Sequence, residues 1–245
     1  MSARIQVITG TDTDVGKTWA TAVLAVEALA AGERVHVDKP AQTGVRPGED
    51  GDVHTVRGLV ADDGDGGGDG VFDAVALDRL TVSEGVRLGP AMAPVDAVAL
   101  SAEAGERAPA LPALREQLDR WVGLASDTEL LLIEGAGGIT VDWTSQGEGP
   151  VDAVLALRRA GYAAELVVVA RPGLGTQNHT RLTVEHAAGR GVVPGRIVVS
   201  GVAEEPDAVE RANLRFLARL AEAHGARFET VSQNLLRRQS SKWVK

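Results

Sequence analysis

The chain contains no cysteine among its 245 residues. This absence excludes disulfide frameworks, thiolate zinc sites, iron–sulfur clusters and cysteine nucleophiles, and it suits a reducing compartment. Aromatic residues make up only 3% of the chain. A hydrophobic core must therefore be built mainly from Ala, Val, Leu and Ile.

Long apolar runs are also absent. The longest, such as 130–133 and 166–170, are far shorter than the roughly 20 residues that span a bilayer. The first ten residues have neither the apolar segment nor the small-residue cleavage site of a signal peptide. We therefore expect a cytoplasmic protein with no membrane partner.

The net charge of −9 excludes a broadly basic surface, so we expect no nucleic-acid partner. Much of this acidity is local, because the stretch 49–73 holds eight acidic residues and one arginine. Within it, residues 62–70 consist only of Asp and Gly, which predicts a flexible surface insertion. A calcium loop is the alternative, but the EF-hand spacing and its closing glutamate are missing. The basic end of the chain, 235–245, is interpreted as a solvated or partly docked terminus, with a partner-binding tail as the alternative.

Short apolar segments alternate with segments of helical periodicity. The expected strands are 5–9, 35–37, 130–133, 166–170 and 197–200, and the expected helices are 17–31, 111–124, 151–160, 180–190 and 207–224. Four of these helices are followed by a glycine, as helix ends often are. The pattern predicts an α/β fold with a doubly wound, mostly parallel sheet of the P-loop NTPase type. No linker divides the chain, so we expect one domain over residues 1–245, although its length also allows two.

The strongest site signal lies between the first strand and the first helix, where residues 10–18 read GTDTDVGKT. Glycines let main-chain N–H groups face phosphate oxygens, and the helix N-terminus favours negative charge. Lys17 can reach the terminal phosphates, and the Thr18 hydroxyl can bind Mg²⁺. Five residues separate Gly10 from Gly16, one more than in the general P-loop pattern. The segment nevertheless predicts a nucleotide-phosphate site.

Two charged residues follow other predicted strands. Lys39 comes shortly after the second strand, and Glu134 follows the apolar residues 130–133. Open α/β sheets bind ligands at the carboxyl ends of their strands. A buried glutamate is costly without a cation, so Glu134 is a candidate ligand of Mg²⁺. Lys39 by itself would be interpreted as a surface lysine.

Taken together, these segments resemble those of the dethiobiotin synthetase family. The family loop GTxTxVGKT matches 10–18 throughout, including the additional residue, and the family motif KPxx[ST]G matches 39–44. EGAGG occurs at 134–138, and LGxxNHxxLT occurs at 174–183. The four motifs occur in the family's order.

The resemblance implies a ligase that uses Mg²⁺ and a nucleoside triphosphate, with ATP expected. The reaction would convert 7,8-diaminopelargonic acid and CO₂ to dethiobiotin through a carbamate and a carbamic–phosphoric anhydride. The implied catalytic residues are Lys17, Lys39 and Thr13. The implied magnesium ligands are Thr18, Asp52 and Glu134, with Asp50 as the alternative to Asp52. The implied nucleotide-binding residues are Asp14, Val15, Gly16, Lys17, Thr18, Glu134, Gly137, Gly138, Ser200 and Gly201.

The same resemblance implies how the organic substrate is held. Thr13 and Thr43 would bind the carbamate or the γ-phosphate. The far carboxylate would bind at a helix N-terminus of the neighbouring subunit, formed by Gly175, Thr176, Gln177 and Asn178. A homodimer with shared active sites follows. The family's adenine-reading Asn–Asp pair is replaced by Val199-Ser200-Gly201, so the preferred base stays open.

Two other functions compete with this interpretation. A P-loop switch or partition ATPase shares the fold, but the lysine typical of its loop and a basic amphipathic terminus are both absent. A cobyrinic-acid-type amidase carries a related EGAG turn, but such chains normally append a glutaminase domain with a cysteine nucleophile. The lack of cysteine disfavours that alternative.

Overall fold

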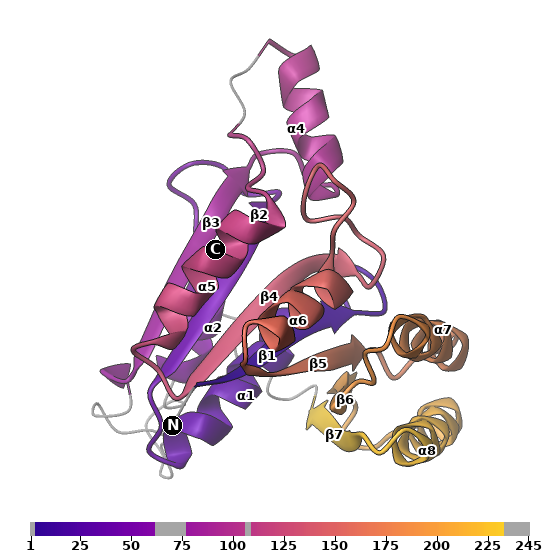
Figure 1. The fold of residues 1–245 in the computed structure, drawn as a ribbon. Coiled ribbons are helices and arrows are strands. Elements are labelled where there is room, and N and C mark those ends of the chain that lie inside the picture. Colours follow the sequence, from indigo (N-terminus) through magenta and orange to yellow (C-terminus); the bar gives the residue numbers. More distant parts are fainter. Residues whose placement is uncertain (1–2, 62–76, 106–108, 233–245) are drawn as a thin grey trace.

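The computed structural model describes residues 3–61, 77–105 and 109–232 (Figure 1). In these residues seven strands form one sheet in the order β3-β2-β4-β1-β5-β6-β7, and every neighbouring pair is parallel. The strands are β1 (Arg4–Gly10), β2 (Val35–Thr43), β3 (Leu80–Leu88), β4 (Leu130–Gly138), β5 (Ala163–Ala170), β6 (Arg196–Val202) and β7 (Arg227–Ser232). The predicted parallel α/β sheet is confirmed.

Helices cover both faces of this sheet. They are α1 (Lys17–Ala30), α2 (Asp52–Ala61), α4 (Pro94–Glu103), α5 (Leu114–Ala125), α6 (Pro150–Arg159), α7 (Thr176–Gly189) and α8 (Ala208–Ala223). Helices α1 and α2 lie on one face, and α5, α6, α7 and α8 lie on the other, while α4 extends beyond the strand ends (Figure 1). The sheet is therefore doubly wound, as predicted.

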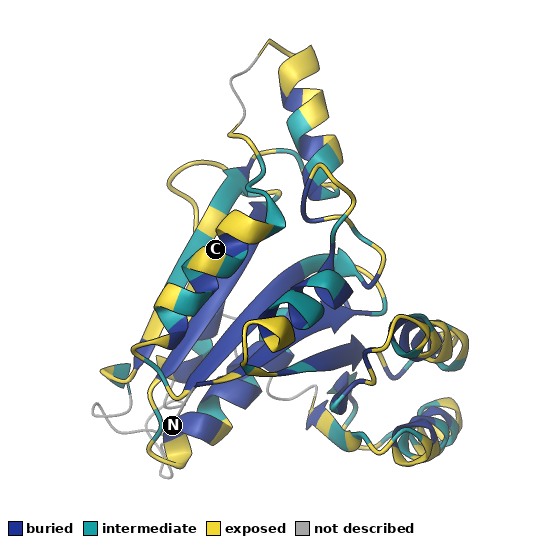
Figure 2. Cartoon of the chain, viewed as in Figure 1, coloured by how far each residue is buried: buried dark blue, intermediate teal, exposed yellow. Residues whose placement is uncertain are grey.

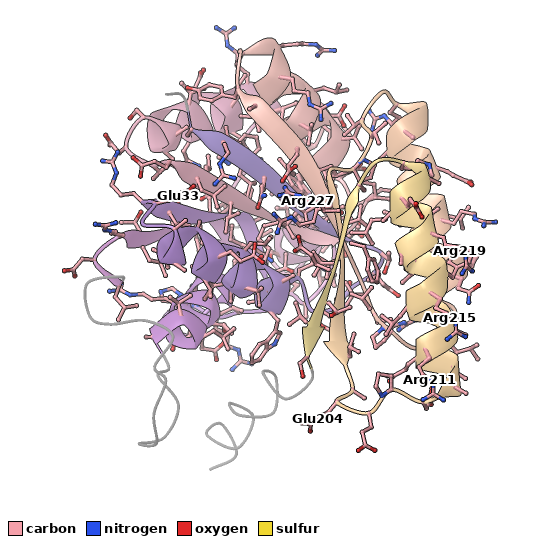
Figure 3. All side chains as sticks on the ribbon, turned by 90° about the horizontal axis from the view of Figure 1, so that it is seen from below. Glu33, Glu204, Arg211, Arg215, Arg219 and Arg227 are labelled. Atoms are coloured by element: carbon pink, nitrogen blue, oxygen red, sulfur yellow. The ribbon has the colours of Figure 1, made fainter. Side chains whose placement is uncertain are left out.

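The core lies between the sheet and these two helical layers. Central strands β1, β4 and β5 are buried on both faces and are rich in Ile, Leu and Val, which explains their continuous apolar runs (Figure 2). Aliphatic side chains dominate all three core clusters, as the scarcity of aromatic residues requires. The outer face of α8 is polar, because Arg211, Arg215 and Arg219 recur at one-turn spacing and point away from the sheet (Figure 3).

The structure contains two strands that the apolar pattern did not predict. β3 and β7 are the edge strands, and each has exposed or half-buried residues along its length. Only five strands were expected, and that count is wrong because half-exposed edges lack a continuous apolar run. β2 also extends six residues beyond the expected 35–37. Its pairing with β4 ends at Asp38, so the missing N–H of Pro40 leaves no gap in that ladder.

The four glycines expected just after helices all have positive φ, between 68° and 89°. The Asp/Gly insertion predicted at 62–70 and the basic end of the chain both lie outside the described residues. In the described part of the chain, no helix has the length and hydropathy required to cross a membrane.

Candidate active site

The segment 10–18 forms a tight turn between β1 and α1. Asp14 and Gly16 both adopt positive φ, 56° and 89°. The side chain of Lys17 folds back across the loop, and its Nζ donates a hydrogen bond to the main-chain oxygen of Asp12 at 3.1 Å. A Cβ on Gly10 would lie 2.5 Å from that oxygen, so glycine is required for this close approach. This turn, which ends at a helix N-terminus, has the geometry of a phosphate cradle.

Beside the cradle, Lys39 and Thr18 contact Glu134, and Lys39 also contacts Asp52. Lys39 Nζ lies 2.9 Å from Glu134 Oε1 and 2.5 Å from Asp52 Oδ2. Thr18 donates its hydroxyl to the same Glu134 oxygen at 2.9 Å. The Lys39 and Glu134 side chains are only 5% and 1% exposed, so water does not solvate either charge well and each charge is offset by the other. The carboxyl ends of β2 and β4 thus place the predicted lysine and glutamate in contact.

The two lysines have opposite electrostatic surroundings. Burial, followed by repulsion from Lys39, lowers the pKa of the Lys17 ammonium below its usual 10.5. Burial would also lower the pKa of Lys39, but the Glu134 and Asp52 carboxylates together outweigh it and raise that pKa. Lys39 is therefore a fixed cation. Lys17 contacts no carboxylate among the described residues, so it is the cation that a phosphate would stabilise most.

The donor set at this point fits Mg²⁺. Glu134 Oε2 is buried and has no hydrogen-bond partner within the described part of the chain, so it is an acceptor that requires a cation or a donor. The Thr18 hydroxyl and the Asp52 carboxylate lie on either side of the Glu134–Lys39 contact. Magnesium typically takes one or two carboxylates, with phosphate oxygens and water completing its shell. In the described residues no three His, Asp or Glu side chains cluster as a complete metal site, so phosphate would have to supply further ligands.

A cavity of about 940 Å³ unites most of the predicted residues. The predicted residues that line it are Thr13, Asp14, Val15, Gly16, Lys17, Thr18, Lys39, Thr43, Asp52, Glu134, Gly137, Ser200 and Gly201. Three residues of the proline-flanked segment 90–94 line it too, namely Ala91, Met92 and Ala93. The cavity runs along the carboxyl ends of the strands, where open α/β sheets bind ligands.

Other predicted residues lie outside this cavity lining. Gly138 lies against the main chain of Gly10 and Thr11, and Asp50 is exposed. The predicted substrate-binding set starts α7, with Gly175 as its N-cap, Thr176 buried, Gln177 half-buried and Asn178 exposed. These four residues do not line the cavity of their own chain.

The glycines that follow Glu134 are required for close packing, a role that the sequence pattern did not indicate. A Cβ on Gly135 would lie 2.2 Å from a ring carbon of Trp143, and one on Gly137 would lie 2.6 Å from a Val141 methyl group. The loop after β4 therefore packs directly on the strand end. Since Lys39 also donates to the carbonyl of Gly135 at 3.2 Å, this packing bears on the lysine's position.

Sequence reasoning missed two polar side chains that shape the site. Gln42 Oε1 accepts the Asp52 N–H at 2.8 Å and so holds the start of α2 beside Lys39. Asn213 donates to the main-chain oxygens of Pro172 and Gly173 and accepts from Gln177. An asparagine on the apolar face of a helix is a signal that could have indicated such a role.

The cavity also has lining residues that no motif predicted, among them Trp19, Thr55, Arg171 and Pro172. Ser200 is buried, and its Oγ has no hydrogen-bond partner among the residues that the structure describes. It packs against the phosphate loop, because a Cβ on Gly16 would lie 2.3 Å from that oxygen. The end of β6 therefore closes one side of the cradle.

Solved structures similar to the chain agree with this architecture. Apo McdA from Cyanothece superposes with a TM-score of 0.53 at 12% identity, covering 96% of this chain and 88% of that chain. The MinC:MinD cell division protein complex of Aquifex aeolicus gives 0.52 at 13% identity, covering 94% and 82%. Likeness at such low identity shows the fold alone.

Proteins of similar sequence identify the family of this chain. A family model described as an AAA domain matches residues 4–66 and 72–230. The chain is 40% identical over 218 residues to the ATP-dependent dethiobiotin synthetase BioD of Mycobacterium avium (strain 104), covering 89% of this chain and 83% of the relative. It is also 40% identical over 217 residues to the protein of the same name from Parafrankia sp. (strain EAN1pec), covering 89% and 79%. The chain therefore belongs to the ATP-dependent dethiobiotin synthetase family.

Proposed function

We propose that this protein makes dethiobiotin from 7,8-diaminopelargonic acid, CO₂ and ATP in biotin biosynthesis. The observation that carries the proposal is the contact of Lys39 with Glu134 and Asp52 beside the phosphate loop, in a chain 40% identical to dethiobiotin synthetases. One cavity extends from the loop to the segment 91–93, so it offers room for phosphate at one end and an organic substrate at the other. A single sheet from Arg4 to Ser232 supports a one-domain organisation of residues 1–245.

The proposed reaction proceeds in three steps. One amine of the diamine attacks CO₂, loses a proton and becomes a carbamate. A carbamate oxygen then attacks the γ-phosphorus of ATP, which forms a carbamic–phosphoric anhydride and releases ADP. The second amine attacks the anhydride carbonyl, expels phosphate, loses a proton and closes the ureide ring.

The side chains contribute mainly charge and position. Lys17 and Lys39 neutralise the oxygens of the transferred phosphoryl group, which carry the negative charge of the transition state. Thr13 and Thr43 line the same cavity and donate hydrogen bonds to the carbamate or the γ-phosphate. None of these roles requires a general base with an unusual pKa.

A divalent cation such as Mg²⁺, when bound here, would offset the negative charge of the phosphate groups. Thr18, Glu134 and Asp52 would hold it, and the unpartnered Glu134 Oε2 supports this assignment. Asp52 is preferred over Asp50, because Asp52 lines the cavity and contacts Lys39 whereas Asp50 is exposed.

The nucleotide base lies at the end of the cavity formed by Ser200, Gly201, Arg171 and Pro172. ATP is the expected nucleotide, since the relatives are named ATP-dependent. Ser200 supplies one hydroxyl where other family members have an amide, so discrimination between bases is weaker here. Steady-state assays with ATP, CTP, GTP and UTP measure it, and a ratio of kcat/KM above about 10³ for ATP over every other nucleotide would contradict this proposal.

The far carboxylate of the substrate binds at the N-terminus of α7 of a second subunit. Leu174, directly before this N-terminus, is 85% exposed, and Leu182 on the same helix is 57% exposed. Apolar exposure of this extent beside a free helix N-terminus supports a homodimer with shared sites.

Mixed dimers test this arrangement. Lys39→Met removes the phosphate-binding cation, and Asn178→Glu adds a repelling charge at the exposed start of α7. If sites are shared, mixing the two inactive variants restores about one quarter of the wild-type activity, because half of the sites in each hybrid contain neither change. If each site lies within one subunit, mixing restores nothing.

An isotope experiment tests the reaction itself. With ¹³C-bicarbonate, ATP, Mg²⁺ and the diamine, mass spectrometry should detect dethiobiotin with a single ¹³C in its ring carbonyl. Omission of ATP or of the diamine should abolish the product. Absence of labelled dethiobiotin from the complete mixture would refute the proposed function.

A further inference from the structure

Strands β2 and β4 separate just before the two buried charged residues of the candidate active site. Their pairing ends at Asp38 and Ile133. Lys39 and Glu134 are the next residues of the two strands, so the ladder between β2 and β4 does not extend to them. On its other side β2 stays paired, but only with the edge strand β3. Contacts from outside the sheet therefore contribute to how firmly β2 is held at this point.

Asp38 makes the main contact of this kind. It is 0% exposed. Arg120 of α5 donates to both carboxylate oxygens of Asp38 at 2.7 Å, and Trp121 of α5 donates to one of them at 2.9 Å. Ser83 of β3 donates to the other oxygen at 2.6 Å. A planar guanidinium that forms two parallel hydrogen bonds fixes the orientation of the carboxylate, so β2 is held in one position relative to α5.

Helix α5 is in turn packed on β4. Trp121 is fully buried and belongs to the same core cluster as Leu131 and Ile133 of β4. Successive residues of a strand face opposite sides of the sheet, so Asp38 faces α5 whereas Lys39 faces α2, on the other side (Figure 1). Helix α5 therefore joins β2 to β4 behind the catalytic cavity, at the point where the two strands separate.

We propose that the contact of Asp38 with α5 positions Lys39 for phosphoryl transfer. Asp38 is a positioning residue, because it faces away from the catalytic cavity and is not among the residues that line it. It acts through the main chain on the residue that follows it. A displacement of about 1 Å in a catalytic group can lower a rate by roughly a hundredfold. This inference rests on the proposed function, which gives Lys39 its role in the transfer.

Replacement of the arginine tests the positioning role. Arg120→Met should lower kcat roughly tenfold to a hundredfold and leave the KM for ATP within about twofold, because the phosphate loop is unchanged and a transition-state contact is weakened. Arg120→Lys keeps the charge but not the planar two-bond contact, so its kcat should lie between those of wild type and Arg120→Met. Each variant is assayed well below its own Tm.

A second buried arginine provides the matched control. Arg196 is 5% exposed and pairs with Glu27 and Glu229. It is the first residue of β6, so it lies at the end of the sheet opposite the catalytic cavity. Arg196→Met removes a buried ion-paired arginine without touching β2, and it should keep the wild-type kcat.

Acetylation of Lys39 provides a readout that does not depend on turnover. The chain has four lysines, at positions 17, 39, 242 and 245, so mass spectrometry of the digested protein can follow each of them. The Lys39 side chain is 5% exposed and contacts two carboxylates, so it should react slowly in the wild type. Arg120→Met should raise the initial acetylation rate at Lys39 about fivefold or more, because the displaced side chain becomes more exposed. Arg196→Met should leave that rate unchanged.

Wild-type kcat in Arg120→Met would overturn the inference, as would wild-type kcat in Arg120→Lys if Arg120→Met does not fold. An equal loss of kcat in Arg196→Met would also contradict it, because the loss would then follow from general destabilisation. An unchanged acetylation rate of Lys39 in the Arg120 variants would exclude the positioning role. Failure of the proposed function differs from these results, since the wild-type protein would then make no dethiobiotin, and the acetylation rates would still decide whether Asp38 positions Lys39.

Discussion

Lys39 supports the fold as well as the reaction, because it compensates the charge of Glu134. The two side chains are 5% and 1% exposed, with 2.9 Å between Nζ and Oε1. Removing one partner of a buried ion pair leaves an uncompensated charge and costs roughly 3–5 kcal/mol. We expect Lys39→Met to lower the free energy of unfolding by about 3 kcal/mol, since Thr18 still donates to Glu134. The matching fall in Tm is about 6–12 °C for a chain of this length.

A double-mutant cycle separates this effect from general damage. Glu134→Gln removes the charge that Lys39 compensates, so the double variant should regain most of the lost stability. The coupling free energy between the two positions should be about 2–3 kcal/mol. Urea denaturation, followed by circular dichroism without nucleotide and with EDTA, measures it. Both variants should lack turnover, so the recovery concerns stability alone.

A weak coupling free energy would contradict the stabilising role of this ion pair. A coupling below about 0.5 kcal/mol would mean that the contact between Lys39 and Glu134 does not contribute to stability in solution. Near-normal turnover of Lys39→Met would remove the lysine from the proposed transition-state contacts.

Three further perturbations test separate parts of the account. Thr18→Val should raise the Mg²⁺ concentration for half-maximal velocity roughly tenfold, and an unchanged Mg²⁺ dependence would exclude the hydroxyl from the magnesium shell. Gly135→Ala would place a Cβ 2.2 Å from the Trp143 ring and should lower the free energy of unfolding by about 1–3 kcal/mol. As the control, Gly123→Ala lies in α5 with open space around the added Cβ and should raise the free energy of unfolding by about 0.5–1 kcal/mol. Burial lowers the pKa of His36 below its usual 6.5. Below pH 6.5 the imidazole therefore binds a proton more readily in the unfolded chain than in the folded one, and the free energy of unfolding should fall as the pH drops. In His36→Gln that part of the fall should disappear from denaturation curves measured between pH 5 and 8, and an identical slope in both proteins would contradict the assignment.

The buried centre of the fold was predictable from sequence, and its edges were not. Strands β4 and β5 have continuous apolar runs because both of their faces are covered. β3 carries Ser83, Glu84 and Gly85 in its middle, and these polar or small residues reflect pairing on one side only. The expected start of α7 near 180 was late by four residues, because its first turn is polar and begins after a glycine.

The site was predictable in its residue types and only partly in its contacts. Motif spacing indicated Lys39 and Glu134 at strand ends, but only three-dimensional register brings their side chains together. The role of Gln42 in holding Asp52 depends on where α2 begins, which residue patterns do not specify. Asn213 acts on a turn about 40 residues away in sequence, and no local pattern contains that information.

The central claim is that phosphate release at this cavity is obligatorily coupled to ring closure. The most direct test measures phosphate and dethiobiotin together in the presence of ATP, Mg²⁺ and bicarbonate, with and without 7,8-diaminopelargonic acid. We expect one phosphate for each dethiobiotin, and almost no phosphate when the diamine is omitted. Equal phosphate release without the diamine would contradict the account, because it would indicate an ATPase whose nucleotide cycle serves another purpose.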